Sequence, residues 1–201
     1  RDLVDDGQFI RFSSAWSEEG LMNLAHLKAH VLKHAPLDLE ALGQIQKTTR
    51  AEVVLTRAQE GTPMYVQPHG DAWVDALMAS SALPMLTRGR VRWDQTWVFD
   101  GGYSDALPLQ RALDLGGRRI LVVRTRPVGD HIAQSTVDYL ASYWFWNEPH
   151  VLELFEKGHE RYNAVVDRLR MGGDGEGRQW EEIAPPFPLQ SDSLSVRGVD
   201  V

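Results

Sequence analysis

The chain has 201 residues, of which 43% are apolar, so it is long enough to bury a hydrophobic core, and one globular domain is expected. Its 28 acidic and 21 basic residues give a formal net charge of -7 without any basic stripe, which argues against a nucleic-acid partner. No apolar run approaches the roughly 20 residues of a membrane span, and the absence of cysteine excludes disulfides, thiolate metal sites and a cysteine nucleophile.

Residues 1–50 are predicted to form a helical segment. Apolar side chains recur at helical spacing across 18–35, Pro36 ends that helix, and a shorter helix covers 39–45. The first helix carries three histidines at four-residue intervals, which share one face and could grip a metal. Because no acidic or thiol ligand accompanies them, a solvated or partly buried polar face is the favoured interpretation. These histidines are His26, His30 and His34.

Residues 51–126 are predicted to form a sheet core that carries the candidate site. A strand, a glycine turn and a second strand give a hairpin signal, and the proline of the second strand confines it to a sheet edge. Two helices and two further strands follow. The expected elements are strands at 52–56 and 62–66, a helix at 71–78, a strand at 92–99, a helix at 108–115 and a strand at 119–124.

The last three of these elements have the length of a strand, helix and strand crossover. Such a unit is right-handed and pairs its two strands in parallel. The strand at 119–124 is a run of isoleucine, leucine and valine between arginines, which is typical of a buried strand. We therefore expect 92–99 and 119–124 to form a parallel pair.

Residues 127–201 are predicted to hold the C-terminal helices and a tail. The expected elements are helices at 132–146 and 148–171, a glycine-rich surface loop at 171–177, and an extended tail without regular structure from Ala184. The aromatic run 143–146 could form a membrane-interface or acyl-chain surface. An aromatic helix more often belongs to a core, which is the favoured interpretation.

The most informative motif is Asp100-Gly101-Gly102, an acidic residue and two glycines at the end of a predicted strand. Two glycines free φ and remove side chains that would keep other groups away, so a carboxylate there can be held rigidly and approached closely. The alternative is a simple turn, since Asp-Gly commonly caps its own backbone. With the flanking residues included, a catalytic carboxylate is the favoured interpretation.

The motif and its flanks resemble the second half of the patatin-like phospholipase family, whose lipid acyl hydrolases pair a serine in a GxSxG turn with an aspartate in a DGG or DGA motif. The segment Ser80-Ser81-Ala82-Leu83-Pro84 matches the small residues and proline that precede the family's aspartate. The resemblance implies an α/β fold with a patatin-like sheet flanked by helices. It covers most of the chain, and its specific part is the central thirty residues or so.

The resemblance also implies roles for individual residues. Asp100 is the base that takes the proton of the catalytic serine, and the two glycines form the turn behind it. The residues that form the site around Asp100 are Gly101, Gly102, Ser81, Pro84, Asp105 and Pro108. The hydroxyls of Ser80 and Ser81 are expected to satisfy backbone groups at a helix end. This chemistry requires no metal and no organic cofactor.

The sequence departs from the family in one large respect, because it contains neither GxSxG nor a glycine-rich loop for an oxyanion hole. In the family both lie N-terminal to the matched region. We expect the chain to be the C-terminal part of a longer protein, or to pair with a partner chain that carries the serine, and to be inactive alone. A lipid or small ester is the expected substrate, with transient contact to a membrane surface. The location is open, with the cytoplasm slightly favoured.

Two alternatives stay open. Ser104, in a segment one residue away from GxSxG, could act as a nucleophile with a later histidine. The candidate histidines are His131, His150 and His159. The second alternative is a non-catalytic lipid-binding or assembly module, because a fold alone does not confer activity.

Overall fold

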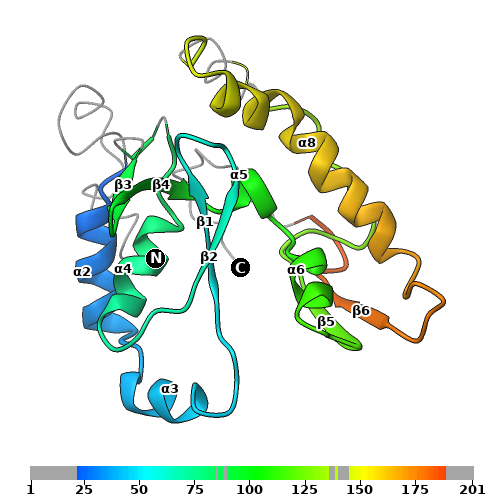
Figure 1. The fold of residues 1–201 in the computed structure, drawn as a ribbon, viewed down its shortest axis with the longest axis horizontal. Coiled ribbons are helices and arrows are strands. Elements are labelled where there is room, and N and C mark those ends of the chain that lie inside the picture. The colour runs from blue at the N-terminus through cyan, green and yellow to red at the C-terminus, as the bar shows by residue number, and fades with distance from the viewer. Residues whose placement is uncertain (1–21, 85, 88–89, 136–138, 140–144, 189–201) are drawn as a thin grey trace.

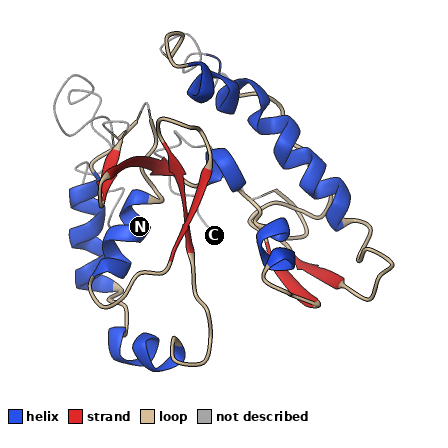
Figure 2. Cartoon of the chain, viewed as in Figure 1, coloured by secondary structure: helices blue, strands red, loops and turns tan. Residues whose placement is uncertain are grey.

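The computed structural model describes residues 22–84, 86–87, 90–135, 139 and 145–188, which form a mixed α/β fold (Figure 1; Figure 2). The helices are α2 (Leu24–His34), α3 (Leu39–Ile45), α4 (Ala72–Ala79), α5 (Gly102–Asp105), α6 (Leu109–Asp114) and α8 (Pro149–Leu169). The strands are β1 (Val53–Arg57), β2 (Pro63–Val66), β3 (Val91–Trp93), β4 (Thr96–Asp100), β5 (Arg119–Val123) and β6 (Gln179–Ile183).

The larger sheet has four antiparallel strands in the order β2-β1-β4-β3. Strands β1 and β2 form the predicted hairpin, in which Val53 lies opposite Val66. Pro63 lies in the edge strand β2, as predicted, where the missing N–H leaves no gap in the hydrogen bonding of the sheet. The predicted helices at 39–45 and 71–78 are confirmed as α3 and α4.

The prediction of one strand over 92–99 is wrong, because the chain turns back on itself within that range. Strands β3 and β4 pair antiparallel, with Trp93 opposite Thr96, so Asp94 and Gln95 form the turn. Asp94 has a φ of 51°. Aspartate tolerates this left-handed conformation better than most residues, which permits a tight turn inside an otherwise strand-like sequence.

The predicted parallel pairing of 92–99 with 119–124 is also wrong. Strand β4 has β1 on one side and β3 on the other, and both are antiparallel to it. Since both edges of β4 are occupied, β5 has no edge to join. It pairs in parallel with β6 instead, in a separate two-stranded sheet. Strand β6 was not predicted.

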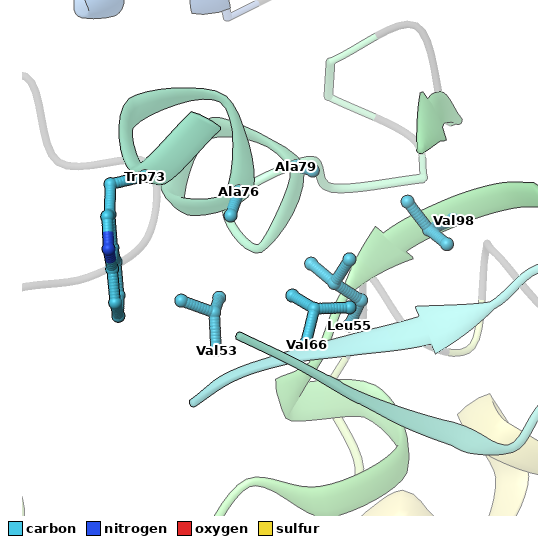
Figure 3. Packing of buried hydrophobic residues seen from close by; sticks show 7 residues of the cluster. All are labelled: Val53, Leu55, Val66, Trp73, Ala76, Ala79 and Val98. Atoms are coloured by element: carbon cyan, nitrogen blue, oxygen red, sulfur yellow. The ribbon is translucent and has the colours of Figure 1, made fainter. Parts of the chain in front are cut away.

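Alternate residues of β4 face opposite sides of the larger sheet. Val98 packs with side chains of β1, β2 and α4 in a first core cluster, and Figure 3 shows α4 laid over the strands there. The cluster consists of Val53, Leu55, Val66, Trp73, Ala76, Ala79 and Val98. Phe99 packs on the other face with Phe155 and its neighbours on α8, in a second cluster. The strand that ends in Asp100 is therefore covered by α4 on one face and by α8 on the other.

A third cluster lies under the small sheet, where Leu113 of α6 and Leu169 of α8 pack with Trp180 of β6. Strand β5 was predicted to be buried, but only its alternate residues pack on this cluster. Leu121 is 59% exposed and Val123 is 72% exposed. The outer face of the β5–β6 sheet is thus exposed, and it mixes apolar with polar and charged side chains: Leu121, Val123 and Ile183 lie there with Arg119, Gln179 and Glu181.

Helix α2 begins at Leu24, later than predicted, because the Asn23 side chain accepts the backbone N–H of His26 and caps the helix there. The first part of that prediction, 18–21, lies outside the described residues. The glycine-rich loop at 171–177 is confirmed, and three of its glycines have positive φ. Residues 184–188 have no regular structure, as predicted, and the rest of the tail lies outside the described residues.

The second C-terminal helix is confirmed as α8. The first is wrong at its start and at its end, where residues 145 and 146 lie in a turn. Residues 132–135 are not helical, because the Asn163 side chain bonds both backbone groups of Ile132. Of the aromatic run 143–146, the first two residues lie outside the described residues. Phe145 stacks on Phe155 at the second cluster, and Trp146 is exposed. None of the helices among the described residues has the length and apolar character needed to cross a bilayer.

Candidate functional site around Asp100

Asp100 is the last residue of β4, and its backbone is fixed on both sides. Its N–H donates to the carbonyl oxygen of Ala82 at 2.9 Å, and its own carbonyl oxygen accepts the Thr56 hydroxyl at 2.7 Å. The first bond ties the strand end to the segment that follows α4. The second ties it to the buried face of β1. The side chain therefore projects from a rigid point.

The carboxyl group of Asp100 is largely withdrawn from water. Burial raises its pKa, and the Gly102 N–H, which donates to Oδ1 at 2.7 Å, offsets only part of that rise. A raised pKa makes a carboxylate a better proton acceptor near neutral pH. The same N–H fixes the orientation of the carboxyl group.

Gly101 is required for space. A Cβ on this residue would lie 2.1 Å from the carbonyl oxygen of Val54, which no side chain can tolerate. The expected close approach is therefore confirmed, whereas the expected need for an unusual φ is wrong, since Gly101 has a φ of -63° and a ψ of -24°. At Gly102 a Cβ would meet Asp100 Oδ1 at 3.0 Å.

Ser104 holds the turn together. Because the Thr56 hydroxyl donates to the Asp100 carbonyl oxygen, the single Ser104 hydroxyl proton faces two acceptors, Thr56 Oγ1 at 2.8 Å and the carbonyl oxygen of Gly101 at 3.3 Å. Thr56 thus bonds both Asp100 and Ser104, a role that sequence reasoning missed. The only available signal was a threonine in the apolar strand 52–56, which has to satisfy its hydroxyl once it is buried.

The serines before the motif act as predicted. Ser80 donates its hydroxyl to the carbonyl oxygen of Val54 at 2.8 Å, and Ser81 donates to that of Leu77 at 2.9 Å. Pro84 is buried a few residues after the end of α4. Between Ser81 and Pro84 lies Ala82, whose carbonyl oxygen accepts the backbone N–H of Asp100.

Asp105 and Pro108 follow the Asp100-Gly101-Gly102 motif along the chain, at the end of α5 and just before α6. The Asp105 carboxylate accepts the hydroxyl of Tyr65 from β2, while burial raises the pKa of Asp105. Arg111 lies over the Tyr65 ring at 4.5 Å and binds Glu52 through two hydrogen bonds, which lower the pKa of Glu52. Pro108 precedes α6 and is exposed. These contacts anchor the turn to the hairpin.

Asp100 opens on a cleft of about 250 Å³ between the end of β4, helix α5 and helix α8. The polar side chains that line it include His159 and Tyr162 of α8, three residues apart on one helix face. Apolar residues supply the remaining side-chain walls, among them Leu83, Ala106, Ile132 and Leu154. Sequence reasoning named His159 only as a partner of Ser104 and missed Tyr162, because nothing local links α8 to the motif.

A second hollow of about 310 Å³ adjoins this cleft and shares five lining residues with it: Gly102, Tyr103, Ala106, Gly158 and Tyr162. Ser104, Asp105 and Arg161 line the second hollow and not the cleft. Two of the other candidate histidines lie elsewhere. His131 bonds Asp167 at 2.9 Å on the surface, and His150 is exposed near the start of α8.

The described residues contain no group of three or more histidine, cysteine, aspartate or glutamate side chains arranged to hold a metal ion. His30 and His34 of α2 lie with their ring centroids 4.4 Å apart.

Comparison with known proteins gives a distant relative. The chain matches no protein-family model. Over 198 residues it is 25% identical to the uncharacterized protein YjjU of Escherichia coli (strain K12). The chain is a distant homologue of YjjU. The similarity covers 98% of this chain but 54% of YjjU, so the chain spans about half the length of that relative.

Proposed function

We propose that the chain is part of a patatin-like serine acyl hydrolase that cleaves lipid or small esters, and that Asp100 is its proton acceptor. The observation that supports this most directly is the position of a desolvated carboxylate at a rigid strand end, open to a cleft. The nucleophilic serine would come from a segment outside this chain. The two sheets described above would be part of a larger patatin-like sheet structure.

In the proposed reaction, Asp100 takes the hydroxyl proton of the serine as its oxygen attacks the ester carbonyl carbon. The tetrahedral intermediate collapses, the alcohol leaves with that proton, and an acyl-serine remains. Asp100 then takes a proton from water, the hydroxide attacks the acyl carbon, and the carboxylic acid is released as the proton returns to serine. The chemistry needs no metal or organic cofactor.

The test uses the full-length protein encoded by the reading frame that contains this chain. Asp100→Asn keeps the size of the side chain and an acceptor for the Gly102 N–H, but it removes the base. Ester hydrolysis is expected to fall by roughly 10²- to 10⁴-fold. Asp114→Asn, on the exposed side of α6, is the matched control and should keep full activity. Undiminished turnover by Asp100→Asn would remove Asp100 from the mechanism.

The rival function is a non-catalytic assembly module. Three apolar side chains on the outer face of the β5–β6 sheet favour it, because Leu121, Val123 and Ile183 are all largely exposed. The upstream reading frame separates the two proposals: a GxSxG segment supports the hydrolase, and its absence supports the module.

Ser104 is a weak nucleophile candidate, because Thr56 and the Gly101 carbonyl already hold its hydroxyl. A serine-reactive phosphonate is therefore expected to leave the isolated chain unlabelled. Labelling at Ser104 would favour the alternative in which this chain carries its own nucleophile.

A further inference from the structure

Strand β5 has one edge that no described residue pairs with. Its other edge joins β6, and these two strands make up the small sheet. The far edge of β6 is partly covered, because the Trp180 N–H donates to the carbonyl oxygen of Gly172 there. Gly173 also forms a bridge with Gln179 at that edge. The open edge of the small sheet is therefore that of β5.

Three residues of β5 present their backbone groups at this open edge. The N–H of Arg124, just after the strand, donates to the carbonyl oxygen of Ile183, so the even-numbered residues face β6. Backbone groups alternate in direction along a strand, so those of Arg119, Leu121 and Val123 face away. The described part of the chain offers their N–H and carbonyl groups no partner. Such a row of backbone groups is a template for a further strand.

The sequence of β5 lacks the features that normally protect an exposed edge. Edge strands of native proteins often carry lysine, proline or a bulge that prevents further pairing. Residues 120–123 are Ile-Leu-Val-Val, and the register with β6 runs through the strand without a bulge. A run that is apolar on both faces is typical of a strand inside a parallel sheet. The sequence of β5 therefore fits a strand with neighbours on both sides.

The outer face of the small sheet has no cover among the described residues either. The inner face packs on α6 and α8 through the third cluster, whereas Leu121 and Val123 are largely exposed on the outer face, beside polar side chains. Parallel sheets occur almost only with both faces covered, and a sheet of two strands is marginally stable by itself. The exposed face and the open edge thus share one explanation, which is a further polypeptide segment.

The comparison with YjjU indicates which partner is available. The similarity leaves nearly half of YjjU unmatched, so that relative has a long additional segment. A second copy of this chain fits less well, because two copies related by a two-fold axis would pair their β5 strands antiparallel. Purely parallel sheets are favoured over mixed ones. A parallel strand from the additional segment is therefore the better match to the β5–β6 pair.

We infer that the open edge of β5 binds a parallel strand from the part of the longer protein that corresponds to the unmatched part of YjjU, and that the same part covers Leu121 and Val123. The inference rests on the proposed function for the existence of that part, from which the serine would come. It goes further by naming the place in the fold where that part joins the chain. It requires no hydrolytic activity.

The first experiment measures amide hydrogen exchange in the full-length protein encoded by the reading frame, with mass spectrometry that resolves single residues. The N–H of Val122 faces β6 and serves as the internal reference. The N–H groups of Leu121 and Val123 should be protected to a similar extent, at least about 100-fold relative to an unstructured amide. Exchange of these two at the unstructured rate would overturn the inference, whether or not Val122 is protected. So would a reading frame that encodes nothing beyond the 201 residues.

The second experiment identifies the partner by photo-crosslinking in the full-length protein. Val123→p-benzoylphenylalanine places a photoreactive group on the outer face of the small sheet. The main product should be a crosslink within one molecule, to a peptide outside the 201 residues. A crosslinked dimer would identify a second copy as the partner, and crosslinks confined to the 201 residues would leave the face uncovered. Either result contradicts the inference.

Two further variants make the crosslinking result specific. Trp146→p-benzoylphenylalanine is the matched control, because Trp146 is 72% exposed, like Val123, but lies outside the small sheet. It should not reach the same peptide. Arg119→p-benzoylphenylalanine tests the same face at the start of β5, because a bulky group at Val123 could itself keep the strand away. If neither of the two β5 variants reaches a peptide outside the 201 residues, the inference is wrong.

The inference and the proposed function can fail separately, because exchange and crosslinking require no turnover. If Asp100→Asn leaves hydrolysis by the full-length protein intact while β5 is protected and crosslinked as described, the hydrolase proposal fails and the docking of a strand on β5 stands. If hydrolysis depends on Asp100 but Leu121 and Val123 exchange as unstructured amides, the reverse holds.

Discussion

Each residue of the Asp100-Gly101-Gly102 motif meets a different physical requirement. Asp100 supplies a carboxylate whose backbone is bonded on both sides. Gly101 supplies space against Val54, and Gly102 supplies the N–H that orients the carboxylate. The motif therefore combines a chemical group, a steric necessity and a fixed donor within three residues.

The steric requirement at Gly101 predicts a large loss of stability in Gly101→Ala. Its Cβ would overlap a backbone carbonyl oxygen that belongs to a central strand, so the clash needs a shift of β1 or of the turn. We expect the free energy of unfolding to fall by about 2–3 kcal/mol, measured by urea denaturation. Gly43→Ala in α3 is the control, because a Cβ there meets nothing within 4 Å. That variant should gain about 0.5–1 kcal/mol.

The buried carboxyl of Asp100 predicts a pH-dependent cost to stability. Burial raises its pKa, so the folded state binds this proton more tightly than the unfolded chain. As the pH rises above the unfolded pKa of about 4, stability is lost until the pH exceeds the raised folded pKa. Asp100→Asn should therefore be more stable than the wild type at neutral pH, with no difference below about pH 4. Denaturation midpoints at both pH values check this, and an equal difference at both contradicts it.

At the scale of elements, the small parallel sheet depends on a buried ion pair. Arg124 directly follows β5 and is 6% exposed, and it binds Glu182 of β6. The pair holds the ends of the two strands together at a point where Val123 and Ile183 on the outer face are exposed and have little packing to stabilise them.

Loss of one partner should therefore be costly. Glu182→Gln leaves the Arg124 guanidinium buried without a countercharge, and we expect the free energy of unfolding to fall by about 3–5 kcal/mol. The comparison is Glu153→Gln, which breaks the exposed pair with Lys157 on α8 and should have no measurable effect. Thermal unfolding of both variants tests this, and similar midpoints would show that the buried pair contributes little.

The same elements show what the sequence could and could not predict. The hairpin of β1 and β2 and the helices α3, α4 and α8 follow from local periodicity and turn residues, and they were predicted. The partner strand of β5 could not be predicted, because strand pairing depends on which distant sheet edges are free. Strand β6 was not predicted, because Glu182, which is buried in an ion pair, breaks the expected alternation of apolar and polar residues.

The candidate site, too, could be predicted from the sequence only in part. The fixed strand end and the close backbone approach at Gly101 were predictable from the motif itself. The contribution of His159 and Tyr162 was not, because they lie about sixty residues further along the chain and reach the cleft only through the packing of α8.

On the scale of the whole molecule, α8 connects the two sheets. The first half of the helix packs on the larger sheet, where Phe155 and Leu154 meet Phe99 in the second cluster. Its last turn, with Leu169, packs on Trp180 of the small sheet in the third cluster. Figure 1 shows the helix running past both parts. A single helix that belongs to both cores should couple their stability.

That coupling predicts the effect of Phe155→Ala, which removes a 2% exposed ring from the second cluster. We expect the free energy of unfolding to fall by about 3–5 kcal/mol. Amide hydrogen exchange should accelerate in peptides from both β1 and β6, because loss of the α8 contact weakens the larger sheet directly and the small sheet through the helix. Phe187→Ala, at an exposed ring, is the control and should change neither. Faster exchange in β1 alone would mean that the two sheets unfold independently.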